Sequence, residues 1–197
     1  MRDTIRAFIA IELGAELRTA LDRLSHQLEH RIEPGTVRWV KTQAMHLTLI
    51  FLGDTPVEQV HLIQRAIAGA ARGFPSLSLT ASGLGCYPNL RQPRVVWVGV
   101  HEPSGHLARL KINLDNHLKG LGFEPEQRPF SPHLTLGRVQ KQASRDAGRK
   151  LGQEVQAMAV GQVGRITVDR IGLIRSDLKP TGPVYSTLAS ISLGQEP

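Results

Sequence analysis

The sequence predicts an α+β fold built from two duplicated lobes. The string His-Leu-Thr-Leu occurs twice, at 46–49 and at 133–136. Each copy opens an apolar strand, and helical and strand patterns lie between the copies. No linker or low-complexity segment divides the chain, so residues 1–197 are expected to form a single domain of two pseudo-symmetric lobes, each with one copy.

The first half of the chain alternates predicted strands and helices. Phe8, Ile9 and Ile11 supply the apolar bulk of a first strand over residues 4–12, and leucines at helical spacing predict a helix over 13–32. An extended piece at 37–40 and a strand at 46–52 follow. Thr55-Pro56-Val57-Glu58 has the pattern of a capping box, which predicts a helix that begins there and runs to about residue 72.

The second half repeats this alternation. The expected elements are strands at 77–81 and 95–100 joined by a loop rich in glycine and proline, a helix at 104–119, a strand at 133–139, a polar loop with a short helix at 140–154, and strands at 155–160, 165–174 and 184–193. The later strands are expected to complete an antiparallel set.

The composition is that of a basic globular protein from a reducing compartment. Lysine and arginine number 24 against 17 acidic residues, a net charge of +7, which favours contact with polyanions such as RNA, although a merely solvated basic surface also fits. Cys86 is the single cysteine, so no intramolecular disulfide can form. The apolar run 7–11 is too short for a signal peptide, and no stretch could span a membrane. A cytoplasmic monomer without membrane contact is expected.

The repeated string places chemically active side chains together. Side chains alternate between the faces of a strand, so His46 shares a face with Thr48, and His133 with Thr135, while the leucines point into a core. An imidazole has an unperturbed pKa near 6.5, so one histidine can accept a proton while another donates one. Threonine hydroxyls can donate to phosphate oxygens. Two such strands side by side would suit a phosphodiester.

Other interpretations of these residues remain open. A single histidine at the start of a strand is more often a satisfied polar residue, and only the repetition with threonine favours catalysis. An RNA-binding module that has lost catalysis would lack a motif residue, yet all four are present. The sequence has no His-Glu-x-x-His and no paired cysteines, so we expect neither a metal nor a cofactor. Cys86, beside Tyr87 and Pro88, is expected to pack rather than react.

These residues and their flanks resemble the 2H phosphoesterases, and among them the bacterial and archaeal RNA 2′,3′-cyclic phosphodiesterases, also called 2′-5′ RNA ligases. The similarity extends in order over most of the chain. The matching segments are Arg6–Ile11, Arg38–Val40 with His46–Gly53, Pro93–Val100, Pro129–Arg138, Leu173–Leu178 and Gly182–Tyr185. The resemblance implies a bilobal duplicated α+β fold in which two antiparallel sheets face a central cleft, with the helices on the outside. It also implies hydrolysis of RNA 2′,3′-cyclic phosphate ends to 2′-phosphates, with joining or breaking of 2′-5′ linkages as an alternative at the same site.

The resemblance also assigns roles that the residues alone leave undecided. It implies that His46 is the proton donor and His133 the proton acceptor, with Thr48 and Thr135 holding phosphate oxygens. Arg138 matches an arginine near the phosphate, but strict alternation places it on the leucine face. Either the strand ends or bulges at Gly137, which glycine permits, or Arg138 reaches round from the end of the strand.

Two further residues are weaker candidates for substrate contact. Phe51 could stack on a base or belong to the core, because alternation also places it with the leucines. Arg94 is expected to touch the RNA backbone on the basis of its charge and position.

Overall fold

A computed structural model describes residues 3–180 and 182–194 of the chain. The structure contains both helices and strands, as the sequence predicts. The order is β1 (Thr4–Glu12), α1 (Ala15–Glu29), β2 (Val37–Trp39), η1 (Thr42–Ala44), β3 (His46–Pro56), η2 (Val57–Gln59), α2 (Val60–Ala71), β4 (Leu77–Tyr87), β5 (Val95–His101), α3 (His106–Lys119), β6 (His133–Val139), α4 (Arg145–Ala157), β7 (Gln162–Val168), β8 (Arg170–Lys179) and β9 (Gly182–Ser192).

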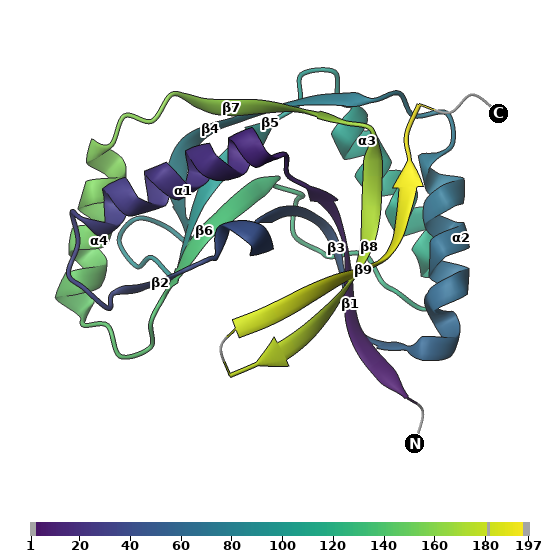
Figure 1. The fold of residues 1–197 in the computed structure, drawn as a ribbon, viewed down its shortest axis with the longest axis horizontal. Helices are drawn as coiled ribbons and strands as arrows, with labels where there is room; N and C mark the ends of the chain where they lie inside the picture. Colours follow the sequence, from purple (N-terminus) through teal and green to yellow (C-terminus); the bar gives the residue numbers. More distant parts are fainter. Residues whose placement is uncertain (1–2, 181, 195–197) are drawn as a thin grey trace.

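The strands form two antiparallel sheets, and each sheet holds one motif strand (Figure 1). The four-stranded sheet has the order β3-β1-β8-β9, and the five-stranded sheet has the order β2-β6-β5-β4-β7. With the short strand β2 set aside, the motif strand stands at the same end of each sheet. The predicted α+β fold class is therefore confirmed, and its division into pseudo-symmetric lobes stays a prediction that this shared order favours.

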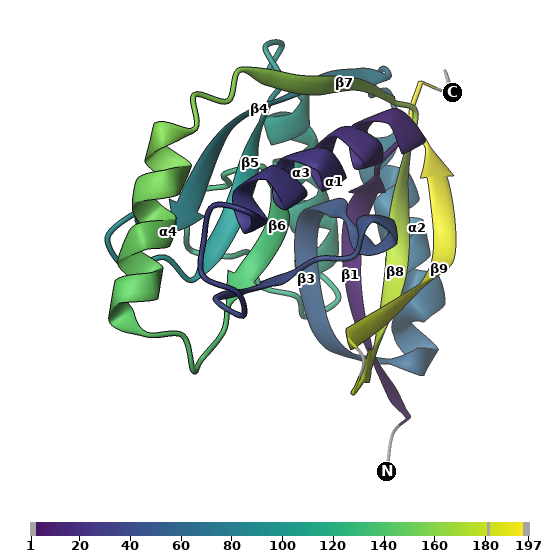
Figure 2. The ribbon, with the colours of Figure 1, turned by 60° about the vertical axis from the view of Figure 1, so that its left-hand side comes forward.

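Two helices each pack against the sheet that does not hold the strand preceding them (Figure 2). Helix α1 follows β1 of the four-stranded sheet but packs on β7 and β6, while α3 follows β5 of the five-stranded sheet but packs on α2 and β3. The buried leucines of both helices belong to one continuous hydrophobic core. The helices that connect the strands thus also join the two sheets through a shared core. Within the described ranges, no helix is long and apolar enough to cross a membrane.

The predicted capping box at Thr55 is wrong. Strand β3 continues through Pro56, which pairs with Thr4, and the Thr55 side chain is fully buried with its hydroxyl donating to the Gly53 carbonyl oxygen at 3.2 Å. Helix α2 begins only at Val60, after the short 3-10 turn η2. Because strand pairing with β1 already satisfies this backbone, the local helix-start signal is overridden.

Several other boundaries differ from the prediction, most by one to three residues and three of them by more. Strand β4 runs on to Tyr87 through the glycines expected to form a loop, because it pairs with β5 along that length. The expected strand at 155–160 is wrong, since Val155 lies in α4 and joins the buried face of that helix with Leu151. The expected strand at 165–174 is two strands, β7 and β8, separated at Asp169. Short apolar runs do not distinguish a strand from the buried end of a helix.

Helix α4 packs so closely on the loop after β4 that one of its glycines cannot be replaced without strain. A Cβ at Gly152 would lie 1.8 Å from the carbonyl oxygen of Leu90, whereas a Cβ at Gly148 meets nothing within 4 Å. We expect Gly152→Ala to lower the free energy of unfolding by about 1–3 kcal/mol through overpacking. Gly148→Ala in the same helix should leave it unchanged or raise it by up to about 1 kcal/mol. Urea unfolding of both variants measures the difference, and equal effects would contradict this packing.

Candidate active site

Each motif strand separates its leucines from its histidine and threonine. Leu47 and Leu49 of β3 and Leu134 and Leu136 of β6 are buried at 3% exposure or less. The histidines and threonines of both motifs are half-buried on the opposite side of their strands. We call this side the histidine face of each sheet. The predicted alternation therefore holds over both His-x-Thr units.

Both imidazoles are oriented by the same kind of hydrogen bond. Nδ1 of His46 lies 2.8 Å from the carbonyl oxygen of Ala44, and Nδ1 of His133 lies 2.8 Å from the carbonyl oxygen of Ser131. In each case the partner stands two residues before the histidine. A carbonyl oxygen only accepts, so Nδ1 carries the hydrogen and donates it. Nε2 is then the ring nitrogen of each histidine that can exchange a proton with a substrate.

A β-bulge follows each motif threonine. In β3, Thr48 pairs with Ala10 and Ile50 with Ile9, which leaves Leu49 as an extra residue. In β6, Thr135 pairs with Trp97 and Gly137 with Val96, which leaves Leu136 as an extra residue. An extra residue resets the alternation of the strand beyond it. The two bulges occupy the same position relative to their histidines.

The bulges place Arg138 and Phe51 on the histidine faces. Arg138 pairs with Val95, two residues from Trp97 on the same face, and Phe51 pairs with Phe8. Both are exposed, Phe51 at 63%, so the core alternative for Phe51 is wrong. Of the two outcomes left open for Arg138, the bulge is the one observed. The extra residue is Leu136, one position before the expected Gly137, where strand β2 packs so closely that a Cβ would lie 2.4 Å from Cγ1 of Val37.

Aromatic rings enclose both histidines. The His46 ring stacks on Phe8 at 4.6 Å between centroids and meets the edge of Tyr185 at 5.1 Å. The His133 ring meets Tyr87 edge-on at 5.0 Å, and Trp97 lies 6.4 Å away. Each of the two tyrosines in the sequence therefore contacts one motif histidine. The sequence alone assigned no such role to these four aromatic residues, although Phe8, Trp97 and Tyr185 lie in segments that carry the family resemblance.

The two histidine faces approach each other near Tyr185. Burial raises the pKa of the Tyr185 hydroxyl, and the positive charge of Arg138 opposes this effect. Tyr185 belongs to the four-stranded sheet and Arg138 to the five-stranded sheet, so the arginine of one lobe lies near the aromatic wall of the other lobe's histidine. Strands β3 and β6 are also in contact. The fold thus brings the two motifs to the junction of the sheets.

Burial lowers the pKa of His46 below its usual 6.5. The hydrogen bond to Ala44 opposes this shift, the nearby charge of Arg18 adds to it, and Glu12 opposes it. Loss of solvation disfavours the imidazolium, so His46 stays neutral in the free protein at pH values where an exposed histidine would begin to protonate.

This shift predicts a pH dependence of stability. Below about pH 6.5 the unfolded chain binds a proton at position 46 that the folded chain does not. The free energy of unfolding therefore decreases as the pH is lowered, until the pH reaches the lowered pKa of the folded state. We expect His46→Gln to lose less stability between pH 7.5 and pH 5 than the unsubstituted protein, as measured by urea unfolding. The exposed His61→Gln is the control. Identical pH slopes for all three proteins would contradict a lowered pKa of His46.

The remaining sequence candidates lie outside this arrangement. Arg94 is exposed just before β5, where its backbone pairs with Tyr87 and Val139, and alternation points its side chain away from the face of Val95. Cys86 is buried, which raises the pKa of its thiol to about 11 and fits packing rather than nucleophilic attack. In the described part of the chain, no three His, Cys, Asp or Glu residues gather as metal ligands.

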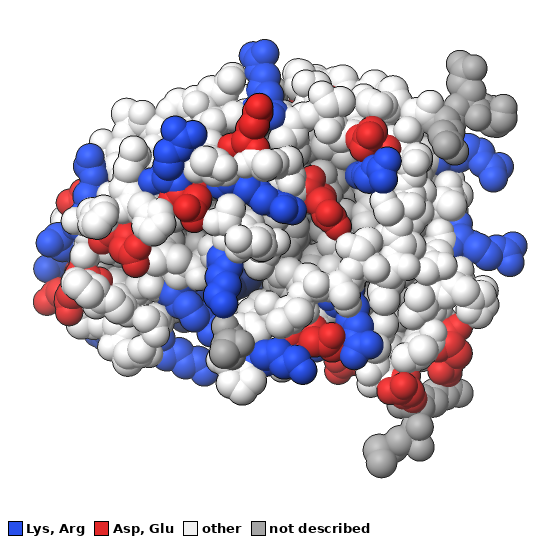
Figure 3. Space-filling model, in the orientation of Figure 1, with Lys and Arg blue, Asp and Glu red and all other residues white. Residues whose placement is uncertain are grey.

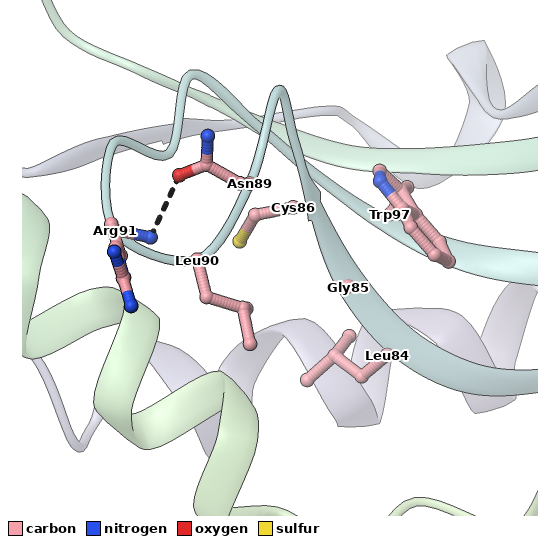
Figure 4. Close-up of a pocket in the computed structure, with 7 residues that line it drawn as sticks. All are labelled: Leu84, Gly85, Cys86, Asn89, Leu90, Arg91 and Trp97. Carbon is pink, nitrogen blue, oxygen red and sulfur yellow. Dashed lines mark hydrogen bonds between the residues drawn. The ribbon is translucent and has the colours of Figure 1, made fainter.

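A depression of about 630 Å³ adjoins the site without containing either histidine. Its lining residues are Leu84, Gly85, Cys86, Asn89, Leu90, Arg91 and Trp97 (Figure 4). Trp97 is the one lining residue near His133. Neither motif histidine therefore lines this depression.

Comparison with known proteins identifies the family. A family model described as the 2′-5′ RNA ligase superfamily matches residues 15–180. The chain belongs to this superfamily. The RNA 2′,3′-cyclic phosphodiesterase of Methanothermobacter thermautotrophicus is 34% identical over 184 residues, which cover 93% of this chain and 96% of that protein. The enzyme of the same name from Thermotoga maritima is 35% identical over 184 residues, 93% of each chain.

Solved structures of superfamily members agree with the fold. A Thermus thermophilus structure superposes with a TM-score of 0.80 at 28% identity and covers 98% of this chain and all of that one. E. coli LigT complexed with 3′-AMP superposes with a TM-score of 0.76 at 28% identity and the same coverage. The family predicted from the two motifs is therefore confirmed.

Proposed function

We propose that this protein opens RNA 2′,3′-cyclic phosphate ends to 2′-phosphates, with His46 and His133 as the acid–base pair and without a metal ion. The observation that carries the proposal is the matched pair of imidazoles, each held through Nδ1 by a carbonyl oxygen at 2.8 Å. Relatives at 34% and 35% identity bear the name of this activity. The names of the relatives support this reaction, and the matched geometry supports these two histidines as its acid–base groups.

The reaction needs one base and one acid on opposite sides of the phosphorus. His133 Nε2 takes a proton from water as the water oxygen bonds to phosphorus. The bond from phosphorus to the 3′ oxygen then breaks, and His46 gives its Nε2 proton to that oxygen. The product carries a 2′-phosphate and a free 3′-hydroxyl. A proton has moved from His46 and another to His133, and exchange with water restores both.

The lowered pKa of His46 is compatible with its role as the donor. An imidazolium with a lowered pKa is a stronger acid toward the leaving oxygen. The bound phosphate anion beside it favours the protonated form and so restores the proton when substrate is present. Thr48, Thr135 and Arg138 donate to the non-bridging oxygens, where negative charge gathers as the water attacks.

The substrate class follows from the charge and from the relatives. The chain carries a net charge of +7, and Figure 3 shows basic side chains distributed over both lobes and the margin between them, with acidic side chains interspersed. Such a surface attracts the RNA backbone by counterion release. We propose RNA or an oligonucleotide with a cyclic phosphate end as the partner, a cytoplasmic location and a monomeric protein.

The superfamily description favours a second activity at the same site. In that reaction the 5′-hydroxyl of a second RNA would replace water as the attacking oxygen, and the same histidines would give a 2′-5′ linkage. Mixing a cyclic-phosphate RNA with a 5′-hydroxyl RNA tests this activity, because ligation gives a longer product whereas hydrolysis leaves both lengths unchanged.

The proposed function is tested with a nucleoside 2′,3′-cyclic phosphate in excess EDTA. We expect hydrolysis at the rate seen without EDTA, and a nucleoside 2′-phosphate as the product by chromatography. Loss of activity in EDTA that returns with a divalent metal would overturn the metal-free mechanism. A 3′-phosphate product would overturn the assignment of the leaving oxygen.

A further inference from the structure

Strands β8 and β9 extend beyond the sheet that holds them. Strand β1 pairs with β8 only over Gly172–Arg175, yet β8 and β9 remain paired out to Lys179 and Gly182. Figure 1 shows this free end projecting from β1 past the junction of the two sheets. We call residues 176–179 and 182–185 the β8–β9 arm. Beyond Arg175 the two strands of the arm pair only with each other.

The base of the arm is part of the candidate active site. Tyr185 meets the edge of the His46 ring at 5.1 Å and contacts Phe8 at 5.2 Å. Ile174, just before the arm, packs in the same small cluster with Phe8. These contacts place Ile174 and Tyr185 on the histidine face. The arm therefore begins at the aromatic wall of the proposed proton donor.

The same face of the arm continues outward with exposed apolar side chains. Residues 174, 176 and 178 share a face of β8, and their register partners 187, 185 and 183 share it on β9. Leu178 is 63% exposed and its partner Pro183 is also exposed. Two residues of strand separate Pro183 from Tyr185, about 7 Å. The exposed side chains of Leu178 and Pro183 thus form an apolar surface that continues outward from the histidine face. We call this surface the apolar ledge.

The opposite face of the arm differs. Arg175 and Asp177 form an ion pair there at 2.9 Å, and Val184 lies on that face with 51% exposure. The charged groups on this side satisfy each other, and Val184 faces away from the histidines. The arm therefore has one face continuous with the candidate site and a second face that provides a matched control.

We propose that the apolar ledge formed by Leu178 and Pro183 binds the base of the nucleotide that precedes the cyclic phosphate. The arm would thereby make the enzyme prefer RNA chains over mononucleotides. This inference rests on the proposed function. Its observations are the continuity of the ledge with Tyr185, its exposed apolar surface and the basic charge of the chain. Bases present apolar π-faces that pack on such surfaces whatever their sequence. The terminal nucleotide lies at His46, and the next one lies along the arm.

The test compares two substrates with the same reacting end: adenosine 2′,3′-cyclic phosphate, and the dinucleotide ApA with a 2′,3′-cyclic phosphate. We expect kcat/KM to be about tenfold higher for the dinucleotide. Leu178→Ser should reduce this preference to within about twofold and leave the mononucleotide rate unchanged. Val184→Ser, on the other face of the arm, should keep the full preference. Thermal melts of both variants confirm that the exposed substitutions leave the fold intact.

The possible outcomes distinguish a failure of the inference about the ledge from a failure of the proposed function on which it rests. Equal rates on both substrates in the unsubstituted protein would overturn the ledge and leave the proposed function standing. Equal losses in Leu178→Ser and Val184→Ser would also overturn it, as would a Leu178→Ser enzyme that keeps its preference, the result expected if the ledge contacts another protein instead. Hydrolysis of neither substrate would overturn the proposed function itself.

Discussion

Replacing His46 or His133 with alanine is expected to reduce hydrolysis of a cyclic phosphate by about 10²–10⁴-fold, the usual contribution of a positioned acid or base. This loss corresponds to about 2.7–5.5 kcal/mol of activation free energy. Both imidazoles have the same orientation and the same half-buried position, so both substitutions should be severe. Single-turnover rates measure the chemical step directly. The double variant should be far less impaired than the product of the two single losses, because the histidines act as a unit.

The control for this prediction is His61→Ala, on the exposed surface of α2. It removes an imidazole without touching either histidine face and should keep the full rate. Circular dichroism of the His46 and His133 variants should show an unchanged fold. A folded His133→Ala protein with unimpaired hydrolysis would contradict the assignment of that residue as the base.

Arg138→Ala is expected to lower kcat/KM by about 10–100-fold, because hydrogen bonds to charged groups contribute about 1.5–3 kcal/mol. The bulge at Leu136 places Arg138 on the histidine face, and its charge reaches Tyr185 across the junction of the sheets. Arg138→Lys should recover part of the loss, since lysine keeps the charge but not the two-pronged geometry. Steady-state kinetics with a dinucleotide substrate measures all three proteins.

Arg149→Ala provides the comparison for charge alone. Arg149 lies on α4 with 68% of its side chain exposed and only an ion pair to Asp146. Its removal lowers the net charge by the same amount as Arg138→Ala. Similar losses in both variants would mean that Arg138 acts through the general basic charge and not at the phosphate.

The sequence predicted the motif strands well because their constraints are local. The bounds of β1 and β6 agree with those expected, and Leu47 and Leu134 are buried while His46 and His133 are not. Apolar alternation over a few residues determines which face is buried, and no distant contact is needed to establish it.

The positions of Phe51 and Arg138 were not predictable in the same way. A bulge depends on how the partner strand pairs, and the extra residues Leu49 and Leu136 are ordinary strand residues in sequence. Only Gly137 hinted at an irregularity. One extra residue changes the face of everything beyond it, so a correct local pattern gave an incorrect face for Phe51.

The aromatic walls depend on contacts between distant segments. Tyr185 reaches His46 from the far end of the chain through the pairing of β9 with β8 and of β8 with β1. The resemblance included Tyr185 in a matching segment but gave it no partner. Likewise, the residues from Thr55 do carry the local pattern of a capping box. Strand β3 nevertheless continues through them, because its pairing with β1 extends to Pro56.

The central claim is that both motifs act on one phosphate, and a crystal structure with a bound nucleoside 2′-phosphate tests it most directly. We predict that a single phosphate group lies within about 3.2 Å of Nε2 of both His46 and His133. The hydroxyls of Thr48 and Thr135 should contact its remaining oxygens. A phosphate held by one histidine alone, or bound in the depression beside Trp97 with neither imidazole in reach, would contradict the two-histidine mechanism.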